Sequence, residues 1–183
     1  IAFDIYRGDF ANFLLKPINY LSFRLIYEMS KNIFRTGIAM VAFGSVLVFF
    51  LGGIPFAWWK IPFVILSIAG AYLINFCLGS IVSLSAFWIT NATRLMFIYF
   101  GILTIFSGMI FPIDLFPPKL FHIFQYLPFG YIFFYPAKII QATSYEPWLL
   151  KGLGIQWALT VLFGAIAWLV FYRGVRRFES IGR

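Results

Sequence analysis

Residues 61–89 read IPFVILSIAGAYLINFCLGSIVSLSAFWI and contain no Asp, Glu, Lys or Arg. This run exceeds the roughly 20 apolar residues that an α-helix needs to cross a bilayer, and its extra length leaves room for tilt. Three further stretches have the same character, at residues 36–53, 95–113 and 152–172. A Lys or Arg at the centre of a membrane helix costs about 2.5–3.5 kcal/mol on insertion scales, and none of the four stretches carries one. The sequence therefore predicts four spanning helices.

The composition of the whole chain agrees with an all-α, polytopic membrane protein. Of the 183 residues, 62% are hydrophobic and 11% are charged, and the mean hydropathy is +0.92. Ordinary soluble domains have about 45–50% apolar and about 25% charged residues. A soluble core cannot bury this much apolar surface, so the composition excludes a soluble enzyme or binding domain.

The basic residues are distributed unevenly between the two sides of the predicted membrane. With four crossings, both chain ends and the link between the second and third spans face one side. That side carries Arg7, Lys16, Arg24, Lys31, Arg35, Arg94, Arg173, Arg176, Arg177 and Arg183, and the opposite loops carry only Lys60, Lys119, Lys138 and Lys151. The positive-inside rule then predicts a multi-pass protein of the inner (plasma) membrane with both ends, including a tail at 173–183, in the cytoplasm. Topology and anionic lipid account for the net charge of +8 without a nucleic-acid partner.

Residues 1–35 form the predicted cytoplasmic region ahead of the first span. Gly8 breaks the chain and Asp9 is expected to cap a short helix, whose apolar face holds Phe10, Phe13 and Leu14. The pair Lys16-Pro17 is expected to end that helix, and Pro17 to open the next one as its first residue.

This second helix is predicted to be amphipathic. Its apolar stripe holds Ile18, Leu21, Leu25, Met29 and Ile33, and its charged stripe holds Arg24, Glu28, Lys31 and Arg35. The pattern predicts a helix that lies along the cytoplasmic leaflet before turning into the first span. On periodicity alone, a plain membrane-surface helix without a partner protein is the alternative.

Small and polar residues recur at four-residue spacing inside two spans. Residues on one face of span two are Ser67, Ala71, Asn75, Gly79 and Ser83, and those on one face of span four are Gly152, Gln156, Thr160 and Gly164. Such faces let helices approach closely and hydrogen-bond across their interface, which is one interpretation. The other is that Asn75 or Gln156 lines a polar path or an interface between two copies. The spans contain no acidic residue or His, which disfavours a proton relay or an ion-coupled site.

Residues 114–147 are aromatic and interrupted by Pro117, Pro118, Pro128, Pro136 and Pro147. Irregular backbone is not tolerated where it faces lipid, so short helices at 120–127 and 131–141 are expected at the outer interface or behind protein. Interfacial anchoring suits Tyr126, Tyr131, Tyr135, Tyr145 and Trp148. His122 is the single histidine, and no chemistry is assigned to it because zinc sites need three or four ligands.

Sequence motifs for catalysis or nucleotide binding are absent. The chain has no GxxxxGK[ST] loop, no HExxH, no GxSxG and no pair of intramembrane carboxylates. Cys77 has no second cysteine to pair with. We therefore expect no catalytic residue, no metal site and no cofactor bound by this chain.

Three segments together resemble a known family, the six-span membrane subunits of type 2 ABC exporters, also called ABC transporter permeases. The first is Arg7-Gly-Asp-Phe-Ala-Asn-Phe-Leu-Leu-Lys-Pro17 followed by Ile18-Asn-Tyr20. The second runs from Ser107-Gly-Met-Ile-Phe-Pro112 through Leu115-Phe-Pro-Pro118 and Tyr126-Leu-Pro-Phe-Gly-Tyr131 to Tyr135-Pro-Ala-Lys138. The third is the tail Arg173-Gly-Val-Arg-Arg-Phe-Glu-Ser180. Their order and spacing across nearly the whole chain make the resemblance stronger than any one of them.

The resemblance implies the C-terminal part of a permease that lacks the family's first two spans. Residues 1–35 would contain the coupling helix, and residues 36–183 would form the transmembrane domain with an outer re-entrant segment at 114–147. The implied ATPase-subunit contact consists of Gly8, Asp9, Phe10, Phe13, Leu14, Lys16 and Pro17. ATP and Mg²⁺ would bind in that separate ATPase subunit, and the pathway would form between two permease copies or two related permeases. The implied cargo is an amphipathic or lipid-like molecule that leaves the cell.

Two other functions fit the same composition. A membrane scaffold or assembly factor shares the four spans and the basic sidedness. A membrane-integral lipid transferase needs clustered acidic or His residues at the interface, and only Asp114, His122 and Glu146 are available on the outer side.

Overall fold

The computed structural model describes residues 1–51, 57–89 and 91–181 of the chain. Only the backbone is described for some parts of these ranges. They are Leu14, most of residues 35–51, several residues of 118–125 and the end of the last helix. The described residues are helical and contain no strand, which confirms the all-α class. In chain order the elements are α1 (Ala2–Arg7), α2 (Asp9–Leu14), α3 (Tyr20–Leu51), the 3₁₀ turn η1 (Trp58–Lys60), α4 (Ile61–Leu84), η2 (Ser85–Phe87), α5 (Ala92–Phe106), η3 (Ile113–Leu115), α6 (Pro118–Tyr126), η4 (Pro128–Tyr131), α7 (Phe134–Gln141) and α8 (Pro147–Ile181).

The chain divides into two compact units. The smaller unit is Gly8–Trp58, and the larger one combines Ile1–Arg7 with Trp59–Arg183. Helix α1 thus belongs with the larger unit although α2 follows it directly in sequence. The predicted boundary at residue 35 separates a cytoplasmic region from a transmembrane domain, whereas the two units are defined by contacts within the chain. The boundary at residue 35 therefore stays a prediction.

The smaller unit begins with a tight turn at Gly8, whose φ of +80° favours glycine. Gly8 occupies the N-cap position of α2 and Asp9 is the first helical residue, so the prediction that Asp9 caps this helix is wrong. Helix α3 begins at Tyr20 rather than at Pro17. The reason is the side chain of Asn19, whose Oδ1 accepts a hydrogen bond from the Ser22 N–H at 3.1 Å and caps the helix there.

Helix α3 continues without a break from Tyr20 to Leu51. The sequence predicted a turn between an interfacial helix and the first span, and the structure has none. No Pro lies between residues 20 and 51, and the two glycines there, Gly37 and Gly44, are tolerated inside a helix. Residues 52 and 53, the end of the predicted first span, lie outside the described residues.

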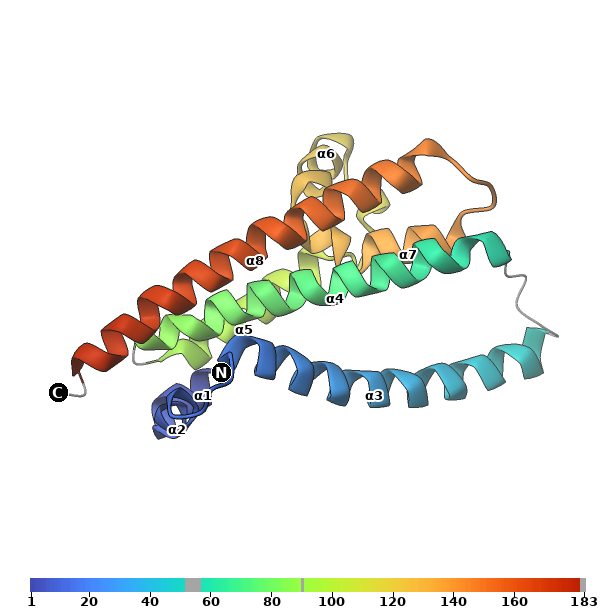
Figure 1. Ribbon diagram of the computed structural model, residues 1–183. Helices are drawn as coiled ribbons and strands as arrows, with labels where there is room; N and C mark the ends of the chain where they lie inside the picture. Colours follow the sequence, from blue (N-terminus) through green and yellow to red (C-terminus); the bar gives the residue numbers. More distant parts are fainter. Residues whose placement is uncertain (52–56, 90, 182–183) are drawn as a thin grey trace. The chain divides into compact units, whose positions relative to one another are not determined.

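The larger unit is built on α4 and α8, which pack along each other in parallel, while α5 returns antiparallel beside α4 (Figure 1). Three contacts fix the parallel pair. Gly70 lies against Gln156, Gly174 lies against Phe87, and a Cβ at Gly164 would lie 3.9 Å from the Cys77 sulfur. The antiparallel pair is fixed by Tyr99, which bonds Asn75, and by Met96, which bonds Ser83. Alternation of this kind is what successive membrane crossings by α4, α5 and α8 require.

Two helices of the described chain are long and apolar enough to cross a membrane, at Trp58–Phe87 and Pro147–Phe178. They contain the predicted spans 61–89 and 152–172 almost entirely. The third predicted span is shorter than expected, because α5 ends at Phe106 instead of running to residue 113. Gly108, with a φ of +82°, turns the chain there, and the Ser107 carbonyl accepts a hydrogen bond from the Phe134 N–H at 3.0 Å.

One end of the larger unit gathers segments predicted to be cytoplasmic. The Tyr6 hydroxyl on α1 donates to the Ile89 carbonyl at 2.9 Å and accepts from the Ala92 N–H at 2.5 Å. Phe87 of η2 packs against Phe178 near the end of α8, with ring centroids 6.1 Å apart. Helix α1, the start of α5 and the end of α8 are therefore joined at this end.

The opposite end gathers segments predicted to lie outside. Lys60 is buried there, and its Nζ donates to the Ile140 carbonyl of α7 at 3.0 Å. Trp59, Phe63 and Tyr145 form an aromatic group with centroid distances of 5.9–6.3 Å. The chain thus closes this end with aromatic rings and one satisfied lysine.

Candidate functional site

A groove of about 550 Å³ opens in the larger unit, where the Pro-broken segment packs against α8. Its volume falls within the roughly 300–1,000 Å³ typical of ligand sites. The residues that line it come from η3, α6, η4, α7 and α8, and they are Ile113, Asp114, Phe121, Phe124, Tyr126, Gly130, Tyr131, Phe134, Tyr135, Lys138, Trp148, Lys151, Gly152 and Ile155. We call this feature the aromatic groove.

Proline positions and aromatic contacts stabilise α6 and η4, two of the elements that line the aromatic groove. A Pro opens α6 and another opens η4, where the missing N–H costs no helical hydrogen bond. Phe124 is buried, and its ring meets Phe106 edge-on at 5.1 Å and Phe116 edge-on at 4.9 Å. Such edge-to-face pairs add about 0.5–1.5 kcal/mol each beyond the area they bury. The predicted helices at 120–127 and 131–141 are present as α6 and α7, with η4 between them.

Helices α7 and α8 approach each other closely at the groove. Gly152 lies directly against the ring of Tyr135, and a Cβ at this glycine would overlap the ring. The Tyr135 hydroxyl donates to the Leu149 carbonyl at 2.5 Å. Burial raises the pKa of Tyr135, and burial together with Tyr126 raises the pKa of Tyr131. Both phenols therefore stay neutral and contribute no negative charge to the groove.

Three charged side chains line the aromatic groove. Lys138 on α7 forms an ion pair with Asp114 of η3. Lys151 on α8 is exposed and makes no ion pair with the described residues. Asp114 and Lys138 are far apart in sequence and follow no local pattern, so their pairing had no sequence signal.

The polar residues predicted to line a pathway or helix interface lie on two different interfaces. Between α4 and α8, Gln156 is fully buried, and its Nε2 donates to the carbonyls of Ser67 and Tyr131, each at 2.9 Å. Thr160, one turn later, donates from Oγ1 to the Gln156 carbonyl at 2.9 Å. Among the described residues, the Gln156 Oε1 has no hydrogen-bond partner.

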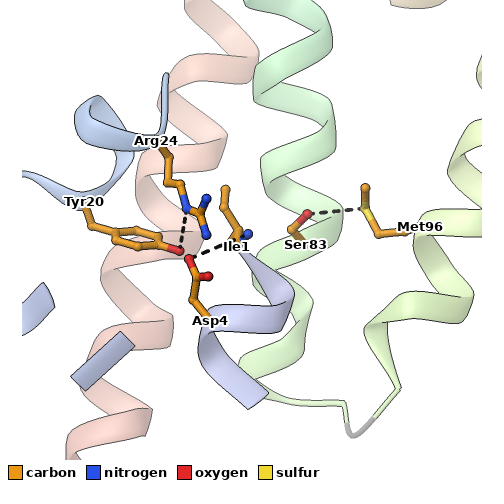
Figure 2. Close-up of polar contacts among 6 residues, drawn as sticks. All are labelled: Ile1, Asp4, Tyr20, Arg24, Ser83 and Met96. Atoms are coloured by element: carbon orange, nitrogen blue, oxygen red, sulfur yellow. Dashed lines mark hydrogen bonds and ion pairs between the residues drawn. The ribbon is translucent and has the colours of Figure 1, made fainter. Parts of the chain in front are cut away.

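Asn75, Gly79 and Ser83 instead face α5. The Tyr99 hydroxyl donates to the Asn75 Oδ1 at 2.8 Å and lies on the same side as Gly79. The Ser83 hydroxyl donates to the Met96 sulfur at 3.3 Å (Figure 2). Residues four apart rotate by about 40° around a helix of 3.6 residues per turn. Over four such steps the predicted stripe therefore moves from the α8 side of α4 to its α5 side.

The residues of the predicted ATPase-subunit contact lie at the start of the smaller unit. Gly8, Asp9, Lys16 and Pro17 are exposed, and the side chain of Leu14 lies outside the described part. Phe10 is 0% exposed and meets Tyr20 edge-on at 4.9 Å. Phe13 is half-buried, with its ring 5.3 Å from Tyr20 and 5.2 Å from Phe23.

Leu15 is the apolar residue that sequence reasoning missed in this segment. It is 85% exposed, more than any other large hydrophobic side chain of the described residues. It directly follows the predicted apolar face, and its position at the C-cap of α2 places it outside the helical spacing. Tyr20, which contacts Phe10 and Phe13, also interacts with Arg24. The Arg24 Nε donates a hydrogen bond to the Tyr20 hydroxyl at 3.3 Å (Figure 2).

No group of three or more His, Cys, Asp or Glu side chains lies close enough to hold a metal ion within the described part of the chain. The side chain of His122 lies outside that part. The groove itself is lined by aromatic side chains and by Asp114, Lys138 and Lys151.

Comparison with curated proteins and with solved structures found no match. A family model described as ABC-2 family transporter protein matches residues 1–182. Together with the apolar helices α4 and α8, this match identifies a membrane protein and a permease component of an ABC transporter. The chain belongs to the ABC-2 transporter family.

Proposed function

We propose that this chain is the membrane-spanning permease part of an ATP-driven exporter, that it works as a dimer with a second copy or a related permease, and that a separate subunit hydrolyses the ATP. Membership of the ABC-2 family over residues 1–182 is the observation that carries the proposal. In this proposal the protein lies in the inner (plasma) membrane with both ends of the chain in the cytoplasm. The basic residues that follow the positive-inside rule support that orientation.

The proposed contact with the ATPase subunit is the segment Gly8–Pro17, centred on α2. Phe10 is buried and Leu15 is exposed, so the apolar anchor of this proposal shifts from Phe10 to Leu15. Asp9 and Lys16 are exposed and supply polar contacts at the two ends of α2. Apolar anchors surrounded by polar contacts are typical of residues that dominate binding energy.

Helix α1 supplies a route by which movement of the docked segment reaches the membrane helices. Its last residue, Arg7, directly precedes Gly8, and Tyr6 bonds both sides of the link between α4 and α5. The Ala92 N–H that Tyr6 satisfies belongs to the first residue of α5. A displacement of α1 would therefore act on the start of α5 through one hydrogen bond, to the Ala92 N–H, and on the chain before the link through a second, to the Ile89 carbonyl.

The test is affinity purification of the full-length protein in mild detergent, followed by mass spectrometry and an ATPase assay. Leu15→Asp should weaken retention of an ATP-binding subunit by about thirtyfold, because a charge replaces an exposed apolar anchor worth about 2 kcal/mol. Phe13→Asp should also uncouple ATP hydrolysis from transport. The Phe13→Asp substitution would weaken docking and would also remove the packing of Phe13 on Tyr20 and Phe23. Leu15→Asp affects docking alone and is therefore the clearer test.

Thr93→Asp is the matched control. Thr93 is exposed in the first turn of α5, where a negative charge suits the helix dipole, and it lies on the predicted cytoplasmic side outside α2. This variant should retain the partner. A clean preparation of wild-type protein with no nucleotide-binding partner would contradict the proposal and favour a membrane scaffold or assembly protein instead.

A further inference from the structure

The aromatic groove carries one more positive than negative charge. Asp114 and Lys138 neutralise each other in their ion pair. Lys151 also lines the groove, is exposed, and makes no ion pair with the described residues. The neutral phenols of Tyr131 and Tyr135 add nothing to this balance, so the surplus charge rests on a single ammonium group.

The walls around Lys151 are apolar. Trp148 lies one turn before it on α8 and Ile155 one turn after it, and both line the groove. Phe121 and Phe134 contribute aromatic surface from α6 and α7. A ligand that satisfies this surface must present an anion at one point and an apolar body next to it.

We propose that the aromatic groove binds an anionic membrane lipid, with the headgroup phosphate on the Lys151 ammonium and the upper part of the acyl chains against the aromatic walls. A free phosphate fits less well, because it would pair with Lys151 but leave the apolar side chains of the groove uncovered. The volume of about 550 Å³ admits a headgroup with the beginning of its chains. Tyr126 and Trp148, which also line the groove, are side-chain types that favour the headgroup level of a bilayer.

The proposal rests on the proposed function in one respect, the placement of the groove at the outer face of a membrane protein. Binding itself is measured without ATP and without an ATPase subunit. A missing ATPase partner and an empty groove are therefore separate results, and each points to the failure of a different proposal.

The experiment uses the full-length protein in vesicles and follows quenching of tryptophan fluorescence by lipids with brominated chains. Subtracting the signal of Trp148→Phe isolates the quenching at the groove from that of the other tryptophans. Brominated phosphatidylglycerol should quench this Trp148 signal more strongly than brominated phosphatidylcholine at equal mole fraction. Lys151→Gln should reduce that preference about fivefold, the size expected for an exposed charge pair.

Lys119→Gln is the matched control, because Lys119 is exposed on α6, is predicted on the same side of the membrane, and does not line the groove. It should keep the wild-type preference. Equal quenching by the two lipids in the wild-type protein would overturn the proposal. An equal loss of the phosphatidylglycerol preference in Lys151→Gln and Lys119→Gln would also overturn it, because the preference would then arise from the general surface charge. Relief of quenching by soluble glycerol phosphate at the same concentration would also overturn it, since the site would then hold the anion without chains.

Discussion

At the residue scale, Gly152 and Gly154 of α8 differ sharply in their surroundings. A Cβ on Gly152 would overlap the Tyr135 ring, whereas a Cβ on Gly154 would have no neighbour within 4 Å. The two positions share one helix and one residue type. Their comparison therefore separates close packing from the intrinsic effect of replacing glycine in a helix.

Gly152→Ala should destabilise the protein by about 1–3 kcal/mol, the usual penalty for overpacking a tight contact. Gly154→Ala should be neutral or stabilising by up to about 1 kcal/mol, because alanine has the higher helix propensity. Thermal unfolding of the purified protein in detergent, followed by loss of monodispersity, measures both. If both variants unfold at the same temperature, α7 does not pack on α8 as described.

The residue scale also shows what sequence reasoning could not reach. Four-residue spacing placed Gly152 and Gln156 on one face of the fourth predicted span. It gave no sign that Gly152 faces Tyr135, because that contact depends on how the Pro-broken segment folds back. Exposure of Leu15 and burial of Phe10 were equally hidden, since both residues sit in one short apolar cluster.

At the element scale, the seam between α4 and α8 depends on Gln156. Its amide reaches across to the Ser67 carbonyl of α4 and to the Tyr131 carbonyl of η4, so one side chain joins three elements. Gly70 makes room for it, because a Cβ there would lie 3.0 Å from the Gln156 Cδ. The seam is thus a polar contact enclosed by small residues, a typical arrangement between membrane helices.

Gln156→Glu should destabilise the protein by about 1–3 kcal/mol, the cost of leaving buried polar groups unsatisfied. A protonated carboxyl offers one donor where the amide offers two, so at least one of the two carbonyls loses its partner. Gln141→Glu, at the exposed end of α7, is the control and should change stability by less than about 0.5 kcal/mol. The same thermal assay applies, and equal stability of the two variants would contradict a central role for Gln156.

Helix positions were more predictable than helix ends. The apolar runs located α4, α5 and α8, and proline spacing located α6 and α7. The start of α3 was missed because Asn19 caps it, which depends on the conformation of one side chain. The end of α5 was missed because the apolar run continues through Ser107 and Gly108, where the tertiary bond to Phe134 favours a turn over further helix.

At the scale of the whole molecule, the larger unit sorts its segments into two ends. Helix α1, η2 and the end of α8 meet at one, and η1, α7 and the start of α8 meet at the other. The charge pattern of the sequence predicts that the first end faces the cytoplasm. Sequence and structure thus group the same segments by independent physical arguments, one from charge and one from packing.

Single cysteines test this orientation in a Cys77→Ser background. Ser144→Cys, in the exposed link before α8, should react with a membrane-impermeant maleimide in intact cells. Thr93→Cys, exposed at the start of α5, should react only after the cells are permeabilised. The reverse pattern would place both chain ends outside and would contradict the proposed docking of an ATPase subunit.

The short length of α5 has a consequence for the bilayer around it. Its 15 residues rise about 1.5 Å each, so the crossing that the sequence predicts for this helix would cover about 22 Å of a hydrocarbon layer that is about 30 Å thick. The remaining depth would fall to the non-helical chain after Phe106, whose backbone groups would then need protein partners because lipid offers none. The bond from Phe134 to the Ser107 carbonyl is one such partner. If α5 crosses the membrane as the sequence predicts, hydrophobic mismatch would be concentrated beside it, and a thicker membrane would strain the protein there first.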